Sequence, residues 1–308
     1  SEDTDAYVGK RGYRYDKKKS LDYINNVIMK KLIFTCLLIF TCTIAQAGKI
    51  ITDSITSNSL GATVKYNVYL PAHYSEKHHY PVVYLLHGLS DDYTAWRDRG
   101  QLKIVADELI ETGEACEMVI VMPNAGGSDI HKIWNGYFNM PGWPYEDFFF
   151  YEFIPAVESK YNAGGSKGQR AVMGLSMGGG GSTVYAQRHP DKFIACYAMS
   201  AWLEGNVRNE KNIDDKLYWT EKSVRDHSAL EFVRQANEAT LRELRSVKWF
   251  FDCGDDDFLL DLTTELHRLM RQRRVKDELR VRNGAHNWEY WHTALRTALP
   301  FASRNFRD

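Results

Sequence analysis

The sequence has no excess of charge of either sign. Its 39 lysines and arginines nearly balance 40 aspartates and glutamates, which leaves a net charge of −1 at pH 7. The first 47 residues hold eight basic and five acidic side chains, so the remainder is slightly more acidic, at about −4. Proteins that bind nucleic acid neutralise phosphates with a basic surface. The composition therefore disfavours a nucleic-acid partner.

Cysteine is scarce, and its spacing gives no sign of a metal site. Of the five cysteines, Cys36 and Cys42 fall in a leading apolar segment, and Cys116, Cys196 and Cys253 follow it. Three cysteines cannot all pair, and no Cys-x-x-Cys or Cys/His cluster has the spacing of a zinc site. Two of the three lie in apolar runs, where a free cysteine behaves as a small buried hydrophobe. We expect neither a disulfide framework nor a structural metal.

The chain also lacks an apolar run long enough to cross a membrane. Residues 32–44 form a 13-residue apolar run that three threonines interrupt, whereas a spanning helix needs about 20 apolar residues. The basic residues 30–31 precede this run, and the small-x-small sequence Ala-Gln-Ala at residues 45–47 follows it. Together they have the pattern of a secretory signal peptide rather than of a membrane anchor.

This pattern sets the expected organisation of the chain. The signal peptide is predicted to run from Met29 to Ala47, so the mature protein is secreted or periplasmic and has no stable membrane anchor. Residues 1–28 precede the first methionine, and we interpret them as an upstream extension outside the natural protein. Residues 48–308 have the length of one large α/β domain. Nothing in the sequence indicates the oligomeric state.

The hydrophobic pattern after residue 48 predicts an α/β fold. Residues 50–70 alternate between apolar and polar side chains, as antiparallel strands with one wet face do. Apolar runs then alternate with amphipathic stretches, which is typical of a mostly parallel sheet with helices on both faces. The expected later strands are residues 81–86, 118–122, 170–174, 193–199, 247–253 and 278–281. The expected helices are residues 102–111, 145–160, 177–189, 258–274 and 288–302.

The strongest motif is Gly-Leu-Ser-Met-Gly at residues 174–178. It fits the pattern G-x-S-x-G and lies directly between a predicted strand and a predicted helix. In α/β hydrolases a serine on this sharp turn exposes its hydroxyl at the top of the sheet, and the crowded backbone accepts only small neighbours. The motif favours Ser176 as a nucleophile. A glycine-rich turn with an incidental serine is the alternative, because such short patterns recur by chance.

Partners for this serine occur in the order that α/β hydrolases use, which is serine, acid and histidine. His286 follows the last predicted strand and is the expected base, with His292 in the final helix as the second candidate. Three adjacent aspartates follow the strand at residues 247–253. Asp257 is favoured because the acid of this fold commonly stands third after a strand-end glycine, and Asp255 and Asp256 remain open.

The reaction also needs donors for a developing oxyanion. In α/β hydrolases one donor is the backbone N–H of the residue after the nucleophile, and the other comes from the loop after an early strand. These rules assign the N–H groups of Met177 and Leu89, the latter within Tyr-Leu-Leu-His-Gly-Leu at residues 84–89.

Four blocks of sequence together resemble the putative esterase family, which includes esterase D, feruloyl esterases, tributyrin esterases and mycolyltransferases. The blocks are VYLLHG at residues 83–88, GLSMGG at 174–179, CGDDDFL at 253–259 and GAHNW at 284–288. EFIP at residues 152–155 is similar to the helix before the nucleophile strand. The resemblance covers about residues 60–305 and implies the α/β-hydrolase fold, with no metal or cofactor.

The resemblance also implies a serine carboxylesterase that works through an acyl-enzyme on a Ser176–Asp257–His286 triad. Export favours external esters, such as short-chain acyl or feruloyl groups, either on small molecules or linked to plant polysaccharides. An acyltransferase, a thioesterase that resembles S-formylglutathione hydrolase and a catalytically silent binding module are the alternatives.

Aromatic loops at strand ends indicate where the substrate would bind. Residues 124–144 and 200–228 are long connections at the carboxyl ends of predicted strands, where open α/β sheets bind ligands. The alternative is that their rings simply pack the loops. The pocket candidates are Trp134, Trp143, Trp202 and Trp219, together with Trp288 at the start of the last helix.

Overall fold

The computed structural model describes residues 23, 25–30, 47–205 and 213–307. The chain divides into two units, Ser1–Gln46 and Ala47–Asp308. In the first unit, residues 25–30 are helical. Most of the predicted signal peptide, residues 31–46, lies outside the described residues, so its cleavage stays a prediction. No helix of the described residues is both long and apolar enough to span a membrane.

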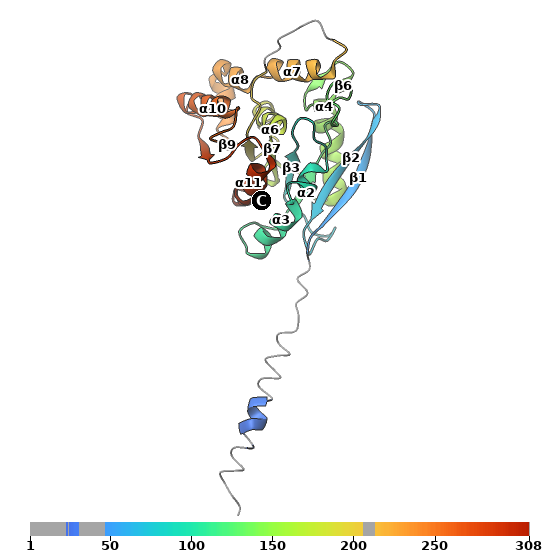
Figure 1. Ribbon diagram of the computed structural model, residues 1–308, viewed down its shortest axis with the longest axis vertical. Coiled ribbons are helices and arrows are strands. Elements are labelled where there is room, and N and C mark those ends of the chain that lie inside the picture. The colour runs from blue at the N-terminus through green and yellow to red at the C-terminus, as the bar shows by residue number, and fades with distance from the viewer. Residues whose placement is uncertain (1–22, 24, 31–46, 206–212, 308) are drawn as a thin grey trace, which may run out of the picture. The chain divides into compact units, whose positions relative to one another are not determined.

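The second unit is built on an eight-stranded sheet in the order β1-β2-β4-β3-β7-β8-β9-β10. The pairs β1–β2 and β2–β4 are antiparallel, and every later pair is parallel. Figure 1 shows β1 and β2 together at one side of this unit. The strands are β1 (Lys49–Ser57), β2 (Ala62–Leu70), β3 (Val82–Leu86), β4 (Val119–Met122), β7 (Arg170–Leu175), β8 (Ala195–Met199), β9 (Lys248–Gly254) and β10 (Asp277–Arg282); β5 (Asn139–Met140) and β6 (Trp143–Pro144) pair separately.

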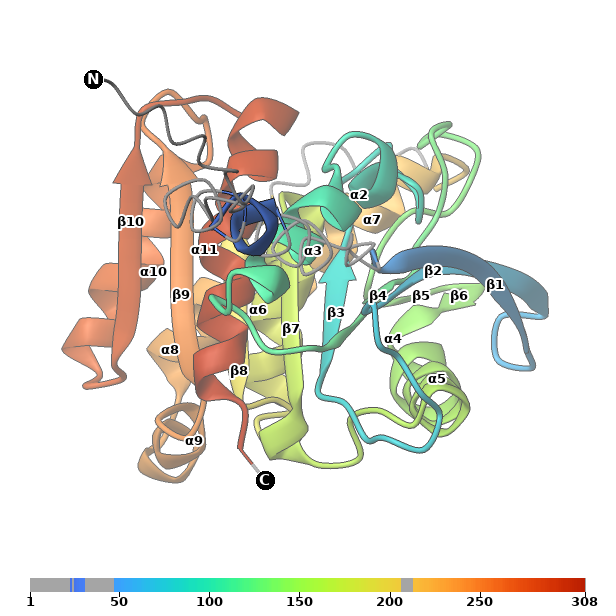
Figure 2. The same cartoon turned by 90° about the horizontal axis from the view of Figure 1, so that it is seen from below.

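Helices cover both faces of the sheet. The helices are α2 (Ala95–Asp98), α3 (Leu102–Glu111), α4 (Tyr145–Asp147), α5 (Ile154–Tyr161), α6 (Met177–Arg188), α7 (Lys216–Asp226), α8 (Ala229–Gln235), α9 (Glu238–Leu244), α10 (Leu260–Gln272) and α11 (Trp288–Asn305), with the π-helix η1 (Phe148–Phe153) and the 3₁₀ turn η2 (Lys167–Gln169). One apolar core contains side chains of α3 and α11, and Figure 2 shows both helices in front of the strands. The other core contains side chains of α5, α6, α8 and α10.

Burial explains why the central strands read as continuous apolar runs. Every residue of β3, β4, β7 and β8 is buried, as expected for parallel strands covered on both faces. β10 is different, because it stands at one edge of the sheet and none of its six residues is fully buried. The predicted fold class, a mostly parallel α/β sheet with leading antiparallel strands, is confirmed.

Candidate active site

Ser176 occupies a strained turn between β7 and α6. Its backbone has φ +52° and ψ −118°, a conformation that side-chain-bearing residues rarely adopt. The turn is held because the Ser176 N–H donates to the Met199 carbonyl at 2.9 Å, and the Ser176 carbonyl accepts from Trp202 N–H at 2.9 Å. A methyl group on Gly178 would come within 2.5 Å of the His87 carbonyl oxygen. The glycine of the motif is therefore required by close backbone approach.

Three predicted side chains form a continuous hydrogen-bonded chain. His286 Nε2 lies 2.9 Å from Ser176 Oγ, and His286 Nδ1 lies 3.0 Å and 2.9 Å from the two carboxylate oxygens of Asp257. Each side chain comes from a different loop at the carboxyl edge of the sheet, after β7, β9 and β10. The fold therefore brings together residues that are 110 positions apart in the sequence.

Asp257 is the buried member of the aspartate run. Burial raises the pKa of its carboxyl, but hydrogen bonds from His286, Ser200 and the Leu259 amide more than offset burial, so the pKa lies below its ordinary value. The carboxylate therefore stays ionised beside His286. Asp255 and Asp256 are exposed. The second candidate base, His292, hydrogen-bonds the Gly100 carbonyl at 2.8 Å through Nδ1.

The two predicted oxyanion donors lie beside the nucleophile. Leu89 lines the same cavity as Ser176, and Met177 begins α6. The first N–H groups of a helix have no partner within the helix, which leaves Met177 N–H available to an oxyanion. Gly88, which precedes Leu89, lies so close to Leu175 that a methyl group on Gly88 would come 2.7 Å from Leu175 Cδ1.

His87 fixes the loop that carries Leu89. Its Nε2 accepts from Ala125 N–H at 3.0 Å, so its Nδ1 carries the proton and donates to the Gly88 carbonyl at 2.9 Å. Burial lowers the pKa of His87 to about 4. The ring is therefore neutral at physiological pH, and it holds the turn that precedes Leu89.

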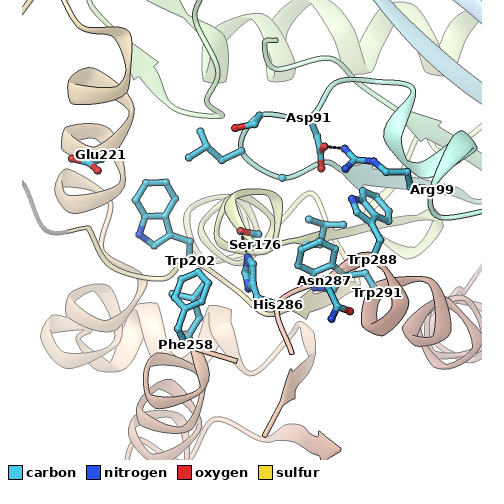
Figure 3. A pocket seen from close by; sticks show the side chains of 15 residues that line it. Asp91, Arg99, Ser176, Trp202, Glu221, Phe258, His286, Asn287, Trp288 and Trp291 are labelled. Carbon is cyan, nitrogen blue, oxygen red and sulfur yellow. Dashed lines mark hydrogen bonds and ion pairs between the residues drawn. The ribbon is translucent and has the colours of Figure 1, made fainter. Parts of the chain in front are cut away.

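A cavity of about 650 Å³ opens over Ser176 and His286. Figure 3 shows Trp202, Phe258 and Glu221 on one side of these two residues, and Arg99 on the other. The Phe258 ring centroid lies 4.5 Å from that of His286. The polar lining also includes Ser90, Asp91 and Asn287, and the apolar lining also includes Leu89, Leu175, Leu259, Trp288 and Trp291.

Two of the five predicted pocket tryptophans, Trp202 and Trp288, line this cavity. The other three lie outside its lining. Trp134 and Trp143 stack with ring centroids 6.4 Å apart, and the Trp219 indole N–H donates to the Ile213 carbonyl at 2.8 Å. The sequence shows only that these segments are rich in aromatic residues. That richness is the same whether a ring lines the cavity or packs elsewhere, so it did not separate Trp202 and Trp288 from the other three.

Several cavity residues were missed by sequence reasoning. Arg99 forms an ion pair with Asp91, and its guanidinium lies 4.9 Å from the Trp288 ring centroid. Phe258, adjacent to the predicted acid, is 75% exposed at the cavity rim. The signal for Phe258 was its position in the aspartate block, whereas nothing in the sequence marked Arg99.

A family model described as putative esterase matches residues 57–302. The chain belongs to the putative esterase family. Membership confirms the predicted enzyme class, a serine carboxylesterase. Within the described residues, no cluster of three or more His, Cys, Asp or Glu side chains has the geometry to hold a metal ion.

Known relatives of this esterase include a solved ferulic acid esterase. It is 48% identical with a TM-score of 0.82, over 85% of this chain and 99% of that one. A xylanase/feruloyl esterase of Xylanibacter ruminicola is 30% identical over 151 residues, which are 47% of this chain and 20% of that protein. This chain therefore corresponds to only about a fifth of the length of that relative. An acetyl esterase of Caldicellulosiruptor saccharolyticus is 21% identical over 72% of this chain and 83% of that protein.

Proposed function

We propose that this esterase hydrolyses feruloyl or short-chain acyl esters, with Ser176 as nucleophile, His286 as general base and Asp257 as the orienting acid. The observation that carries the proposal is the hydrogen-bonded chain from Asp257 through His286 to Ser176. Ser176 and His286 line the cavity. A base within about 3 Å of a nucleophile, itself oriented by a third group, is the arrangement that nucleophilic catalysis requires.

In the proposed acylation, Ser176 Oγ forms a bond to the ester carbonyl carbon while its proton passes to His286 Nε2. The carbonyl oxygen becomes an oxyanion, which the N–H groups of Leu89 and Met177 stabilise. One such donor is worth roughly 3–4 kcal/mol in a well-studied serine protease. The carbon–oxygen bond to the alcohol then breaks, and the alcohol leaves with the proton from His286.

Deacylation repeats these steps with water. His286 removes a proton from water as the water oxygen attacks the acyl carbon, and Ser176 Oγ leaves with that proton. Ionised Asp257 stabilises the imidazolium that forms in both halves of the reaction. The free carboxylic acid is the second product.

Two observations support a feruloyl group as the acyl part. The ferulic acid esterase at 48% identity matches nearly its whole length to this chain. The cavity also has aromatic walls, with Trp202 and Phe258 on one side of His286 and Trp288 on the other (Figure 3). A planar phenolic ring stacks on such walls with a gain of roughly 0.5–1.5 kcal/mol per ring pair. The xylanase part of one relative's name supports a polysaccharide-linked substrate.

We further propose that the enzyme acts outside the cytoplasm after cleavage at Ala47. The signal-peptide pattern at residues 29–47 supports this location. N-terminal sequencing of protein expressed from Met29 in a secreting bacterium tests it. A mature chain that begins at Gly48 is expected, and a chain that retains Met29 would contradict export.

The reaction is tested by initial rates on methyl ferulate, p-nitrophenyl acetate, p-nitrophenyl butyrate and S-formylglutathione, with Ser176→Ala in parallel. Turnover of methyl ferulate that the variant lacks is the expected result. Acetate hydrolysis without methyl ferulate hydrolysis would contradict the feruloyl assignment. A preference for S-formylglutathione would favour a thioesterase, and acyl transfer to an added sugar would favour a transferase.

A further inference from the structure

The cavity extends to both sides of the nucleophile. Figure 3 shows Trp202 and Phe258 on one side of Ser176 and His286, and Arg99 on the other, and all of these residues line the same cavity. The carbonyl carbon of an ester is trigonal, so its acyl and alcohol parts leave that carbon in different directions. With the carbonyl carbon at Ser176 Oγ, one part lies toward the rings and the other toward Arg99.

The two sides of the cavity differ in chemistry. One presents the rings of Trp202 and Phe258, and the other presents the ion pair of Arg99 and Asp91. Among the described residues that line the cavity, Arg99 is the only lysine or arginine. A planar acyl ring suits the aromatic side, whereas the hydroxyl groups of a sugar need both donors and acceptors. Polarity therefore assigns the acyl part to the rings and the alcohol part to the ion pair.

The Arg99 guanidinium is held in place but still accessible. It pairs with Asp91 and lies 4.9 Å from the Trp288 ring centroid. Trp288 in turn packs edge to face against Trp96 and Trp291, with ring centroids 5.1 Å and 5.5 Å away. The Arg99 side chain is nevertheless 53% exposed. Because a guanidinium has more N–H donors than one carboxylate can accept, donors remain for a ligand.

Asp91 connects this ion pair to the oxyanion loop. It stands two residues after Leu89 in the sequence. Its N–H donates to the Gly88 carbonyl at 3.2 Å, and its carbonyl accepts from the Asn135 side-chain amide at 3.3 Å. Its side chain is only 8% exposed. The loop that offers Leu89 N–H to the carbonyl oxygen therefore also fixes Arg99 beside the place where the alcohol part of the same ester would lie.

We propose that Arg99, paired with Asp91, binds hydroxyl groups of a neutral sugar that forms the alcohol part of the ester. The inference rests on the proposed function and adds the chemical class of the alcohol, which the triad does not determine. The ion pair carries no net charge, so Asp91 would repel an acidic sugar that Arg99 attracts. Hydroxyl groups can instead accept from the guanidinium and donate to the carboxylate.

The test measures a ratio that isolates the alcohol. It is kcat/KM for the feruloyl ester of arabinose divided by kcat/KM for methyl ferulate. The acyl group is the same in both esters, and their intrinsic difference in reactivity cancels when a variant is compared with the wild type. If the enzyme hydrolyses acetyl but not feruloyl esters, the same ratio is measured with acetyl arabinose and methyl acetate.

Arg99→Ala is expected to lower this ratio about tenfold, the effect of one hydrogen bond to a charged group. Because that change leaves Asp91 unpaired, Arg99→Lys is the second variant. It keeps a cation for Asp91 but loses the planar fork, so the ratio should fall here too. Arg97→Ala is the matched control, since Arg97 lies on α2, pairs with Asp98 and is outside the cavity lining. Its ratio should equal that of the wild type, and circular dichroism confirms folding of every variant.

The outcomes are distinguishable from failure of the proposed function. If Ser176→Ala retains turnover of both esters, the proposed function is wrong. If Ser176→Ala is inactive but Arg99→Ala keeps the wild-type ratio, only the sugar site is overturned. A ratio that falls in Arg99→Ala but not in Arg99→Lys, or that falls equally in Arg97→Ala, would overturn it as well. Faster hydrolysis of feruloyl galacturonate than of feruloyl galactose, esterified at the same hydroxyl, would overturn the neutral sugar.

Discussion

Gly254 and Gly284 meet backbone to backbone, and a methyl group on Gly254 would lie only 2.1 Å from the Gly284 carbonyl oxygen. The same oxygen accepts from Asp256 N–H at 3.0 Å, and the Asp255 carboxylate accepts from Gly284 N–H at 2.9 Å. Asp255 and Asp256 thus hydrogen-bond the loop that carries Asp257 to the loop that carries His286. This contact leaves Asp257 as the aspartate that reaches the histidine.

Gly254→Ala should force these two loops apart. A backbone oxygen cannot move aside as a flexible side chain can, so we expect the free energy of unfolding to fall by roughly 1–3 kcal/mol, as overpacking does. Turnover of p-nitrophenyl acetate should fall at least about tenfold, because misplacement of catalytic groups is costly. Gly127→Ala is the control, since its methyl group would make ordinary contact with Ile133 at 3.5 Å. Equal activity in both variants would contradict the contact.

The three aspartates should differ sharply in their effect on catalysis. Asp257→Asn should lower kcat by a factor on the order of 10⁴, as removal of the orienting charge does in a well-studied serine protease. Asp255→Asn keeps an oxygen that can accept from Gly284 N–H and removes only the charge, so it should cost less than about tenfold. The measurement is the steady-state kcat of each variant on p-nitrophenyl acetate. A larger loss in the Asp255 variant would move the acid to that position.

The buried neutral His87 should make stability depend on pH. Its pKa is about 4 in the folded protein because of burial, against an ordinary value of 6.5. Below pH 6.5 the unfolded chain binds a proton that the folded chain refuses, so stability falls as pH drops from about 6.5 to 4. The shift corresponds to about 3 kcal/mol. The free energy of unfolding, measured with urea at several pH values in this range, should depend less steeply on pH in His87→Gln than in the wild type. An identical dependence in the two proteins would contradict a neutral His87.

The aromatic walls of the cavity should affect KM for feruloyl esters more than KM for butyrate esters. Phe258→Ala and Trp202→Ala should each raise KM for methyl ferulate about threefold to tenfold, because each removes one stacking partner. KM for p-nitrophenyl butyrate should change less, since its acyl chain has no ring. Trp219→Ala is a matched control outside the cavity lining. Equal effects of all three variants would mean that the cavity does not hold the acyl ring.

Much of the fold follows from periodicity in the sequence. The predicted helix at residues 102–111 has the same bounds as α3, and the predicted strands coincide with β3, β4, β7, β8, β9 and β10 to within two residues at each end. β3, β4, β7 and β8 are buried throughout and β9 nearly so, which makes their apolar patterns strong. β10 was predicted although none of its residues is buried. The segment at residues 200–228 was predicted only as a connection, although it contains α7, whose N-terminal cap Asp215 accepts from Leu217 N–H.

The site was predictable only where its chemistry has a local signature. Ser176, His286 and the aspartate run stand in short motifs beside strand ends, which parallel topology brings to one edge. Arg99 was missed because its place in the cavity arises from a contact between distant segments. Its guanidinium lies over the ring of Trp288, which is 189 residues away, and no local pattern encodes that contact.

β10 lies at one edge of the eight-stranded sheet. As an edge strand it presents unpaired backbone groups that another chain could extend, the route by which sheets aggregate. Its sequence is DELRVR, so four of its six side chains carry charge, and Val281 is the exposed apolar residue among them. A second copy that added a strand here would have to desolvate those charges. The charges of β10 therefore disfavour growth of the sheet from this edge.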